Sequence, residues 1–232
     1  MTVIPIEISE IRQETPTVRV LKIDLLNQDF KYKPGQWIDC YIDIDKPHLV
    51  AGYSITSSPT LKGFIELAIK ISGNPVTNFI HKKAIVGDTL YIDGGYGEIF
   101  YEPIMGDKVV LAGAGIGITP LISILRFIDE STEAKVTLFQ SASTFSELIY
   151  YNELKARSKL NHRIKYYPTI TRENPPKGVD RGRINEKLLE KYDIDTESLF
   201  FLSGPGEMIP ELSEYLIWRG VDKEKIMYEV WW

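Results

Sequence analysis

Three glycines at alternate positions give the clearest chemical signal in this sequence of 232 residues. The run VVLAGAGIGITP, residues 109–120, passes from an apolar stretch through the glycines to a Thr-Pro pair that can open a helix. Glycine lets a backbone approach a phosphate closely, and the free N–H groups of a helix N-terminus attract anions. The spacing departs from the usual dinucleotide fingerprint G-x-G-x-x-G, and a plain strand-to-helix turn is the alternative. The predicted phosphate loop comprises Gly113, Ala114, Gly115, Ile116, Gly117 and Thr119.

Two other segments carry side chains that suit a bound ligand. In AGYSITSSP, residues 51–59, Tyr53 stands beside Ser54, so an aromatic ring could stack on a planar group while a hydroxyl binds its edge. In FLSGPGEMIPEL, residues 201–212, a strand leads through glycine and proline into a helix. Ligands of open parallel sheets bind beyond the carboxyl ends of strands. Packing residues and an ordinary loop are the respective alternatives.

A second strand-turn-helix unit and the chain's last residues complete the candidate features. Gly73-Asn74-Pro75 leads into a helix predicted over 75–84, with Thr77 as a possible N-cap, which makes a second anion site. The chain finishes Glu229-Val230-Trp231-Trp232. Because each tryptophan can bury roughly 150–250 Å², we expect these rings to be docked, or else to close a core as part of a last strand.

The elements that must position these residues change in kind near residue 104. Before it, the β-rich runs 18–25, 37–44 and 64–71 alternate with turn signals, which predicts an antiparallel sandwich or barrel. After it, strands alternate with helices, which predicts a parallel sheet with covering helices and a ligand cleft between two domains, 1–103 and 104–232. The predicted strands are 108–112, 136–140, 163–171, 198–203 and 226–231, and the helices are 120–129, 148–157, 185–191 and 208–219.

Composition narrows the classes of protein that fit. The content is 44% apolar and 25% charged, which is typical of a globular protein. The one cysteine, Cys40, cannot form an internal disulfide or hold an iron–sulfur cluster, so a redox role within one chain needs an organic cofactor, and we expect no metal site. A net charge of −5 argues against nucleic acid as a partner. With no apolar run of about 20 residues and no signal peptide, we expect a cytoplasmic protein without a membrane partner.

Taken in order, these features resemble the ferredoxin–NADP reductase family, flavoproteins with an N-terminal flavin-binding barrel and a C-terminal pyridine-nucleotide domain. The match spans nearly the whole chain. The Ala-Gly-aromatic-Ser motif at 51–54 and the Trp-Trp ending further resemble one branch, the oxidoreductase NAD-binding domain-containing proteins. The resemblance implies a flavin-binding antiparallel β-barrel followed by a nucleotide-binding parallel sheet, with FAD (or FMN) and NAD(P)H as cofactors.

The resemblance also implies roles for particular residues. Ser54, Ser203 and Glu229 would surround the reacting atoms, with Ser54 reaching toward flavin N5 and Ser203 beside nicotinamide C4. Tyr53 would line the isoalloxazine, and Ser54, Ile55 and Thr56 would be further cofactor-binding residues. Ala68, Ile69 and Lys70 would border the ribityl and pyrophosphate arm, and the turn Gly73, Asn74, Pro75, Val76 and Thr77 would hold flavin phosphate. The nucleotide would also contact Arg172, Ser203, Gly204, Pro205 and Met208, and Trp231 or Trp232 would cover the flavin and be displaced by nicotinamide.

Three positions depart from the family pattern. Ala51 replaces the arginine that clamps the flavin pyrophosphate, which leaves the choice between FAD and FMN open. Ser203 replaces a cysteine, and Trp232 extends one residue beyond the family's aromatic end.

The implied function is a reductase that passes a hydride from nicotinamide C4 to flavin N5 and electrons to an acceptor. That acceptor is free flavin, a ferredoxin-like protein or another molecule on a separate chain. The alternatives are a regulatory or electron-transfer subunit of a larger redox complex, whose known examples carry a C-terminal cysteine cluster absent here, and a member that has lost its flavin. Residues 140–144, QSAST, hold no cation for a 2′-phosphate, whereas 155–187 hold ten Lys or Arg against three acids. On balance the sequence favours NADH.

Overall fold

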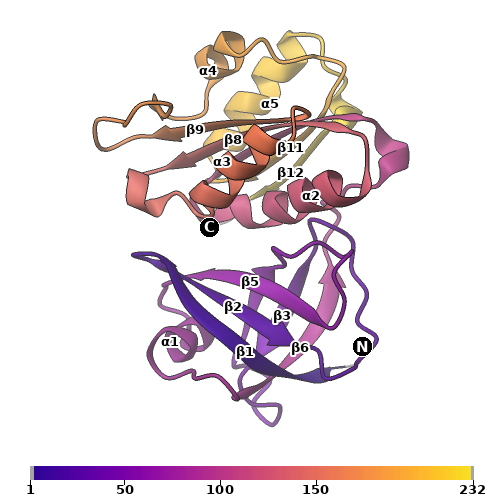
Figure 1. Cartoon of the computed structure of the whole chain (residues 1–232), viewed down its shortest axis with the longest axis vertical. Coiled ribbons are helices and arrows are strands. Elements are labelled where there is room, and N and C mark those ends of the chain that lie inside the picture. The colour runs from indigo at the N-terminus through magenta and orange to yellow at the C-terminus, as the bar shows by residue number, and fades with distance from the viewer. Residues whose placement is uncertain (1–2, 231–232) are drawn as a thin grey trace.

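The computed structural model describes residues 3–230, and its first half is a six-stranded antiparallel sheet (Figure 1). The strand order is β4-β3-β6-β1-β2-β5. A bridge between Ile55 and Leu67 joins the end of β4 to β5, the two edge strands, so the sheet closes into a barrel. The strands are β1 (Ile4–Thr15), β2 (Val18–Asp24), β3 (Trp37–Tyr41), β4 (Val50–Ser54), β5 (Phe64–Lys70) and β6 (Thr89–Tyr96).

Every second residue of these strands points into the barrel, as the pleat requires. Ile6 and Ile8 of β1 and Ile38 and Cys40 of β3 are fully buried in one apolar cluster. Burial, with a smaller contribution from the neighbouring Asp39, raises the pKa of the Cys40 thiol to about 12. Cys40 is therefore a core residue.

Helix α1 (Pro75–Lys82) lies against the barrel and begins where predicted, but its N-cap and its last residue differ from the prediction. The N-cap is Asn74, whose side-chain oxygen accepts from the backbone N–H of Val76 at 2.8 Å, so the expectation that Thr77 caps the helix is wrong. Thr77 instead shares a 2.8 Å hydrogen bond with the Tyr53 hydroxyl. The helix ends at Lys82, two residues before the predicted end.

The second half is a six-stranded sheet in which all paired strands are parallel, in the order β10-β9-β8-β7-β11-β12. Its strands are β7 (Lys108–Ala114), β8 (Lys135–Ala142), β9 (Ile164–Ile170), β10 (Asp180–Arg181), β11 (Leu199–Gly204) and β12 (Ile226–Val230). The helices are α2 (Ile118–Ser131), α3 (Tyr151–Leu160), α4 (Glu186–Lys191) and α5 (Met208–Trp218). The short 3₁₀ turns are η1 (Pro103–Met105), η2 (Gly115–Gly117), η3 (Phe145–Glu147) and η4 (Lys223–Lys225).

The helices cover opposite faces of this sheet (Figure 1). Residues of α2 and α3 pack with Leu111 and with Val18, Val20 and Ala68 of the barrel in one cluster, so α2 lies between the sheet and the barrel. Residues of α4 and α5 pack with Val110 on the other face. The two domains therefore share a continuous apolar core through α2. No helix within residues 3–230 combines the length and apolar character that crossing a bilayer needs.

Helix α3 begins at Tyr151, three residues after its predicted start. Tyr150 takes a left-handed backbone conformation, with φ of 58°, and donates its N–H to the Glu14 carboxylate at 2.9 Å. A contact with the barrel therefore delays this helix, and that contact leaves no local mark in the sequence.

Candidate functional site

A cavity of about 390 Å³ lies at the carboxyl ends of the parallel strands. It is bordered by Gly115 after β7, Ser143 after β8, Arg172 after β9 and Pro205 after β11. Strands β8 and β11 flank β7 on opposite sides and lead to helices on opposite faces, which is the switch point where such sheets bind ligands. The structure thus gathers predicted residues from four separate segments at one cavity: Lys70, Ala114, Gly115, Arg172, Pro205 and Met208.

The three glycines of the loop differ in why a side chain is disfavoured there. A Cβ on Gly113 would lie 2.7 Å from the Ile118 side chain, and one on Gly117 would lie 2.8 Å from the Cα of Gly204. These two positions let α2 and β11 approach the loop. Gly115, with φ of 57°, has open space around it and borders the cavity. Thr119 is buried, and its hydroxyl donates to the Ile116 carbonyl at 2.8 Å.

The barrel contributes to the same site through Lys70, at the end of β5. Lys70 borders both this cavity and an adjoining one of about 110 Å³ that reaches Thr17 and Ile116. Lys70 thus lies on the rim of the nucleotide-domain cavity, and its predicted place along the flavin arm stays a prediction. The site is therefore built by both domains.

Charges on the cavity rim are mixed. Arg172 is exposed, while Arg183 is 3.7 Å from Glu207 in an ion pair whose side chains are both mostly exposed. Glu211 of α5 also borders the cavity. An exposed pair of this kind is worth little in stability, so Arg183 and Glu207 can rearrange around a ligand.

The end of β11 holds the predicted nicotinamide-side residues. Ser203 is fully buried, lies opposite Gly113 of β7 and pairs in register with Glu229 of β12. Its hydroxyl has no hydrogen-bond partner among the described residues. Trp231 and Trp232, the predicted stacking rings, lie outside the described residues.

On the barrel, β4 and α1 gather the predicted flavin-side residues. Tyr53 is held through its hydroxyl by Thr77, and burial raises the pKa of that phenol above its usual value. Ser54, at the end of β4, is 5% exposed, and within residues 3–230 its hydroxyl also lacks a partner. Asn74 occupies N–H groups at the start of α1 that a phosphate would use, and Ala51 pairs with Cys40 in the strand register.

Several residues that were predicted to contact a cofactor have side chains that pack in the core or bind another residue. Ile55, Ile69 and Val76 lie in the barrel core. Ala68 belongs to the shared core, and the Thr56 hydroxyl binds Glu66. Any contact that these residues make with a cofactor must come through the backbone, so their predicted roles remain predictions. The cavity residues do not include Tyr53 or Ser54.

Sequence reasoning missed a buried polar network between the domains. Glu66 of β5 accepts from Arg126 of α2 at 2.8 Å, from the Tyr150 hydroxyl at 2.7 Å and from Arg12 of β1 at 3.0 Å. Burial alone would raise the pKa of Glu66, but the two guanidinium groups and the Tyr150 hydroxyl lower it. The available signal was a charged residue within each of two apolar runs, Arg126 in LISILRFI and Glu66 in FIELAI.

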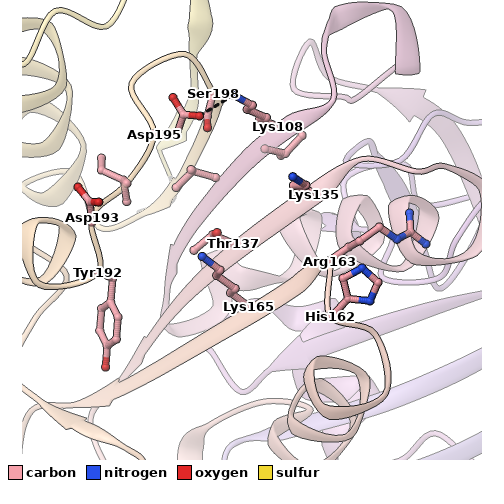
Figure 2. Close-up of a pocket in the computed structure, with 13 residues that line it drawn as sticks. Lys108, Lys135, Thr137, His162, Arg163, Lys165, Tyr192, Asp193, Asp195 and Ser198 are labelled. Atoms are coloured by element: carbon pink, nitrogen blue, oxygen red, sulfur yellow. Dashed lines mark hydrogen bonds and ion pairs between the residues drawn. The ribbon is translucent and has the colours of Figure 1, made fainter.

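A second cavity, of about 260 Å³, lies at the opposite end of the parallel sheet. Figure 2 shows Lys108, Lys135 and Lys165 there, from the beginnings of β7, β8 and β9. Lys108 is paired with Asp195 at 2.7 Å. None of the predicted site residues borders this cavity, so we place the functional site at the carboxyl ends.

The described residues fit both implied cofactors. The partnerless hydroxyls of Ser54 and Ser203 suit hydrogen bonds to the polar edges of a flavin and a nicotinamide. Gly115, Lys70 and Arg172 supply open backbone and positive charge for a pyrophosphate.

Comparisons with known proteins agree with this arrangement. The family models for an oxidoreductase FAD-binding domain and an oxidoreductase NAD-binding domain match residues 5–101 and 111–214. These lie on either side of the predicted boundary after residue 103, which itself stays a prediction. The chain is 33% identical to oxidoreductase NAD-binding domain-containing protein 1 from Homo sapiens, over 94% of this chain and 77% of the relative.

Two further similarities concern a reductase subunit and a solved structure. The glycine betaine monooxygenase reductase subunit from Chromohalobacter salexigens is 30% identical over 83% of this chain and 54% of that one. The crystal structure of a ferredoxin NADP⁺ reductase from Neisseria gonorrhoeae with bound FAD and NADP superposes with a TM-score of 0.82, covers 99% of each chain and shares 24% identity. The predicted fold, an antiparallel barrel followed by a parallel-sheet domain, is confirmed.

Proposed function

Because the chain belongs to the family of oxidoreductase NAD-binding domain-containing proteins, we propose that it passes a hydride from a reduced nicotinamide nucleotide to FAD and electrons to a separate acceptor. The chain is a flavoprotein reductase that binds FAD and a nicotinamide nucleotide. The bound flavin supplies the redox chemistry, and the protein supplies orientation and hydrogen bonds.

The observation that carries this proposal is that two buried hydroxyls without a partner in residues 3–230, those of Ser54 and Ser203, lie at or near strand ends, whereas a third, that of Ser213, lies within α5. Ser54 ends a barrel strand on the flavin side, and Ser203 lies near the end of a parallel strand on the nicotinamide side. A buried hydroxyl without a hydrogen-bond partner costs free energy. Its presence therefore points to a ligand that supplies the missing partner. Ser54 would donate to flavin N5, and Ser203 with Glu229 would form the polar wall beside nicotinamide C4.

The remaining residues would hold the two cofactors. Tyr53, fixed by Thr77, would present its ring to the isoalloxazine. Gly115 would bring its backbone to the nucleotide pyrophosphate, with Lys70 and Arg172 as neutralising charges. We propose NADH as the preferred nucleotide because residues 140–144, QSAST, at the end of β8 offer no cation for a 2′-phosphate.

We further propose a protein acceptor on a separate chain. A relative at 30% identity is named as the reductase subunit of a monooxygenase, which supports this assignment. Its sequence is longer than the matched region, since only 54% of it is covered.

The test is anaerobic reduction of the purified holoprotein by NADH and, separately, by NADPH, followed through flavin absorbance. Ferricyanide, free flavin and a ferredoxin then serve as acceptors in turn. We expect bleaching of the flavin, faster with NADH, and reoxidation by a protein acceptor. A protein that takes up neither FAD nor FMN, or a bound flavin that neither nucleotide reduces, would refute the proposal.

A further inference from the structure

Side chains of helix α2 donate hydrogen bonds to two successive backbone carbonyls of the barrel, in the segment that follows Ser54. Ser123 donates to the carbonyl of Ser57 at 2.7 Å, and Arg126 donates from Nη1 to the carbonyl of Thr56 at 2.9 Å. Ser123 and Arg126 are three residues apart, so they lie on one face of the helix. Both are buried, at 0% and 8% exposure. We call these two contacts the α2 clamp.

The guanidinium of Arg126 is fixed from several sides. Its Nε and Nη2 bind both carboxylate oxygens of Glu153 in α3, at 2.8 and 2.6 Å, and its Nη1 also reaches Glu66 of the barrel at 2.8 Å. A planar fork held in this bidentate way has little rotational freedom. The carbonyl of Thr56 is therefore held at a defined position relative to α2 and α3.

The two ends of the clamp belong to the two halves of the proposed site. Helix α2 begins directly after the loop that contains Gly115, and Thr56 comes two residues after Ser54. Adhesion between the domains already has a source in the shared apolar core, where Val18 and Val20 pack with residues of α2. A buried ion pair is weak evidence for a net gain in stability, because desolvating its charges offsets their attraction, although removing one partner is costly.

We propose that Ser123 and Arg126 are positioning residues for hydride transfer, setting the distance and angle between a flavin held by the barrel and a nicotinamide held by the nucleotide domain. This inference rests on the proposed function. Hydride transfer is steep in distance, and a misplacement of about 1 Å can lower a rate by roughly 100-fold.

The test compares the holoproteins of Arg126→Lys and Ser123→Ala with wild type by anaerobic stopped-flow reduction with NADH. Lysine keeps the positive charge of Arg126 but cannot make the bidentate hydrogen bonds of the guanidinium. We expect the limiting reduction rate of Arg126→Lys to fall at least about 10-fold, while the dissociation constants of flavin and NADH stay unchanged. The isotope effect with NADH deuterated at C4 should rise, because hydride transfer then limits the rate more fully. Ser123→Ala should change in the same direction by less.

Arg157→Lys is the matched control. Arg157 also binds Glu153, at 2.9 Å, but its remaining partners, Asp129 and Glu130, lie in the nucleotide domain. We expect its limiting rate to match wild type. A role in stability alone would lower the melting temperature or flavin content of the Arg126 and Ser123 variants without changing the rate per bound flavin, and that result would overturn the inference. A wild-type flavin that neither nucleotide reduces would overturn the proposed function as well.

Discussion

Two buried hydroxyl groups lie on the proposed flavin and nicotinamide sides of the molecule. Ser54 and Ser203 are buried, yet their oxygens have no partner in the described part of the chain. Elsewhere in the barrel, buried hydroxyls are paired, as Ser58 is with Thr60 at 2.7 Å. Unpaired buried polar groups are typical of places where a protein binds or reacts, so these two serines support the proposed site.

At this scale, Ser54→Ala should act in opposite directions on stability and activity. Removing an unpaired buried hydroxyl should raise the stability of the flavin-free protein by up to about 1 kcal/mol. Loss of the hydrogen bond at N5 should slow flavin reduction about 10-fold or more. Calorimetry of the apoprotein and stopped-flow reduction of the holoprotein measure the two effects.

Ser58→Ala is the control for that prediction, because it breaks the hydrogen bond to Thr60. We expect it to lower stability and leave reduction unchanged. An apoprotein of Ser54→Ala that is less stable than wild type, or one with a normal reduction rate, would contradict our assignment of Ser54.

Among the elements, the glycine loop η2 between β7 and α2 combines packing with binding. A Cβ at position 117 would collide with the backbone of Gly204, at 2.8 Å from both its Cα and its N. Position 115 has no such neighbour but requires a left-handed backbone, with φ of 57°. The two glycines should therefore respond differently to alanine.

We expect Gly117→Ala to destabilise the protein by about 1–3 kcal/mol and to weaken nucleotide binding, because the end of β11 must shift. Gly115→Ala should cost about 1 kcal/mol through its backbone conformation alone. Urea unfolding and nucleotide titration of each variant measure these changes. Gly73→Ala, where a Cβ meets nothing within 4 Å, is the control, and a Gly117→Ala protein as stable as that control would refute the packing argument.

Elements with strong local signals could be predicted from sequence, and those set by distant contacts could not. The apolar runs of β7, β8 and β11 predict buried parallel strands within two residues of their observed ends. Strand β4 contains Gly52 and strand β6 contains Gly94 and Gly95, which weaken the strand pattern. Of the candidate site, Gly115 and Pro205 followed from loop chemistry, Lys70 and Arg172 came only from the family resemblance, and the rest of the cavity lining was not predicted. The Arg126 to Glu66 contact joins positions 60 residues apart, so no local pattern could reveal it.

For the whole molecule, the interdomain network makes stability depend on pH. Burial alone would raise the pKa values of Glu66 and Glu153, but Arg126, together with Tyr150 and Arg12 at Glu66 and with Arg157 at Glu153, lowers both below their ordinary 4.5. A carboxyl whose pKa is lowered by folding stabilises the protein above its unfolded pKa, and that stability is lost as the pH falls through the folded value. Stability should thus decrease as the pH falls below 4.5.

We expect Glu66→Gln to cost about 3 kcal/mol near neutral pH, because Arg126 loses a buried anionic partner. The same change should flatten the acid limb of a plot of melting temperature against pH. Calorimetry from about pH 7 to about pH 3 measures both. Glu197→Gln, at an exposed ion pair with Lys225, should reproduce the wild-type curve, and a Glu66→Gln curve of wild-type slope would show that the network does not cause the acid loss.

The α2 clamp binds main-chain oxygens on one side and depends on side chains on the other. A carbonyl is present whatever residue occupies positions 56 and 57, whereas Ser123 and Arg126 are specific donors. Substitutions at positions 56 and 57 therefore leave the acceptors of these two hydrogen bonds in place, whereas substitutions of Ser123 or Arg126 remove a donor. The clamp thus tolerates any side chain at positions 56 and 57, and within the Arg126 contacts it is Glu66 that ties the barrel's sequence to the helix.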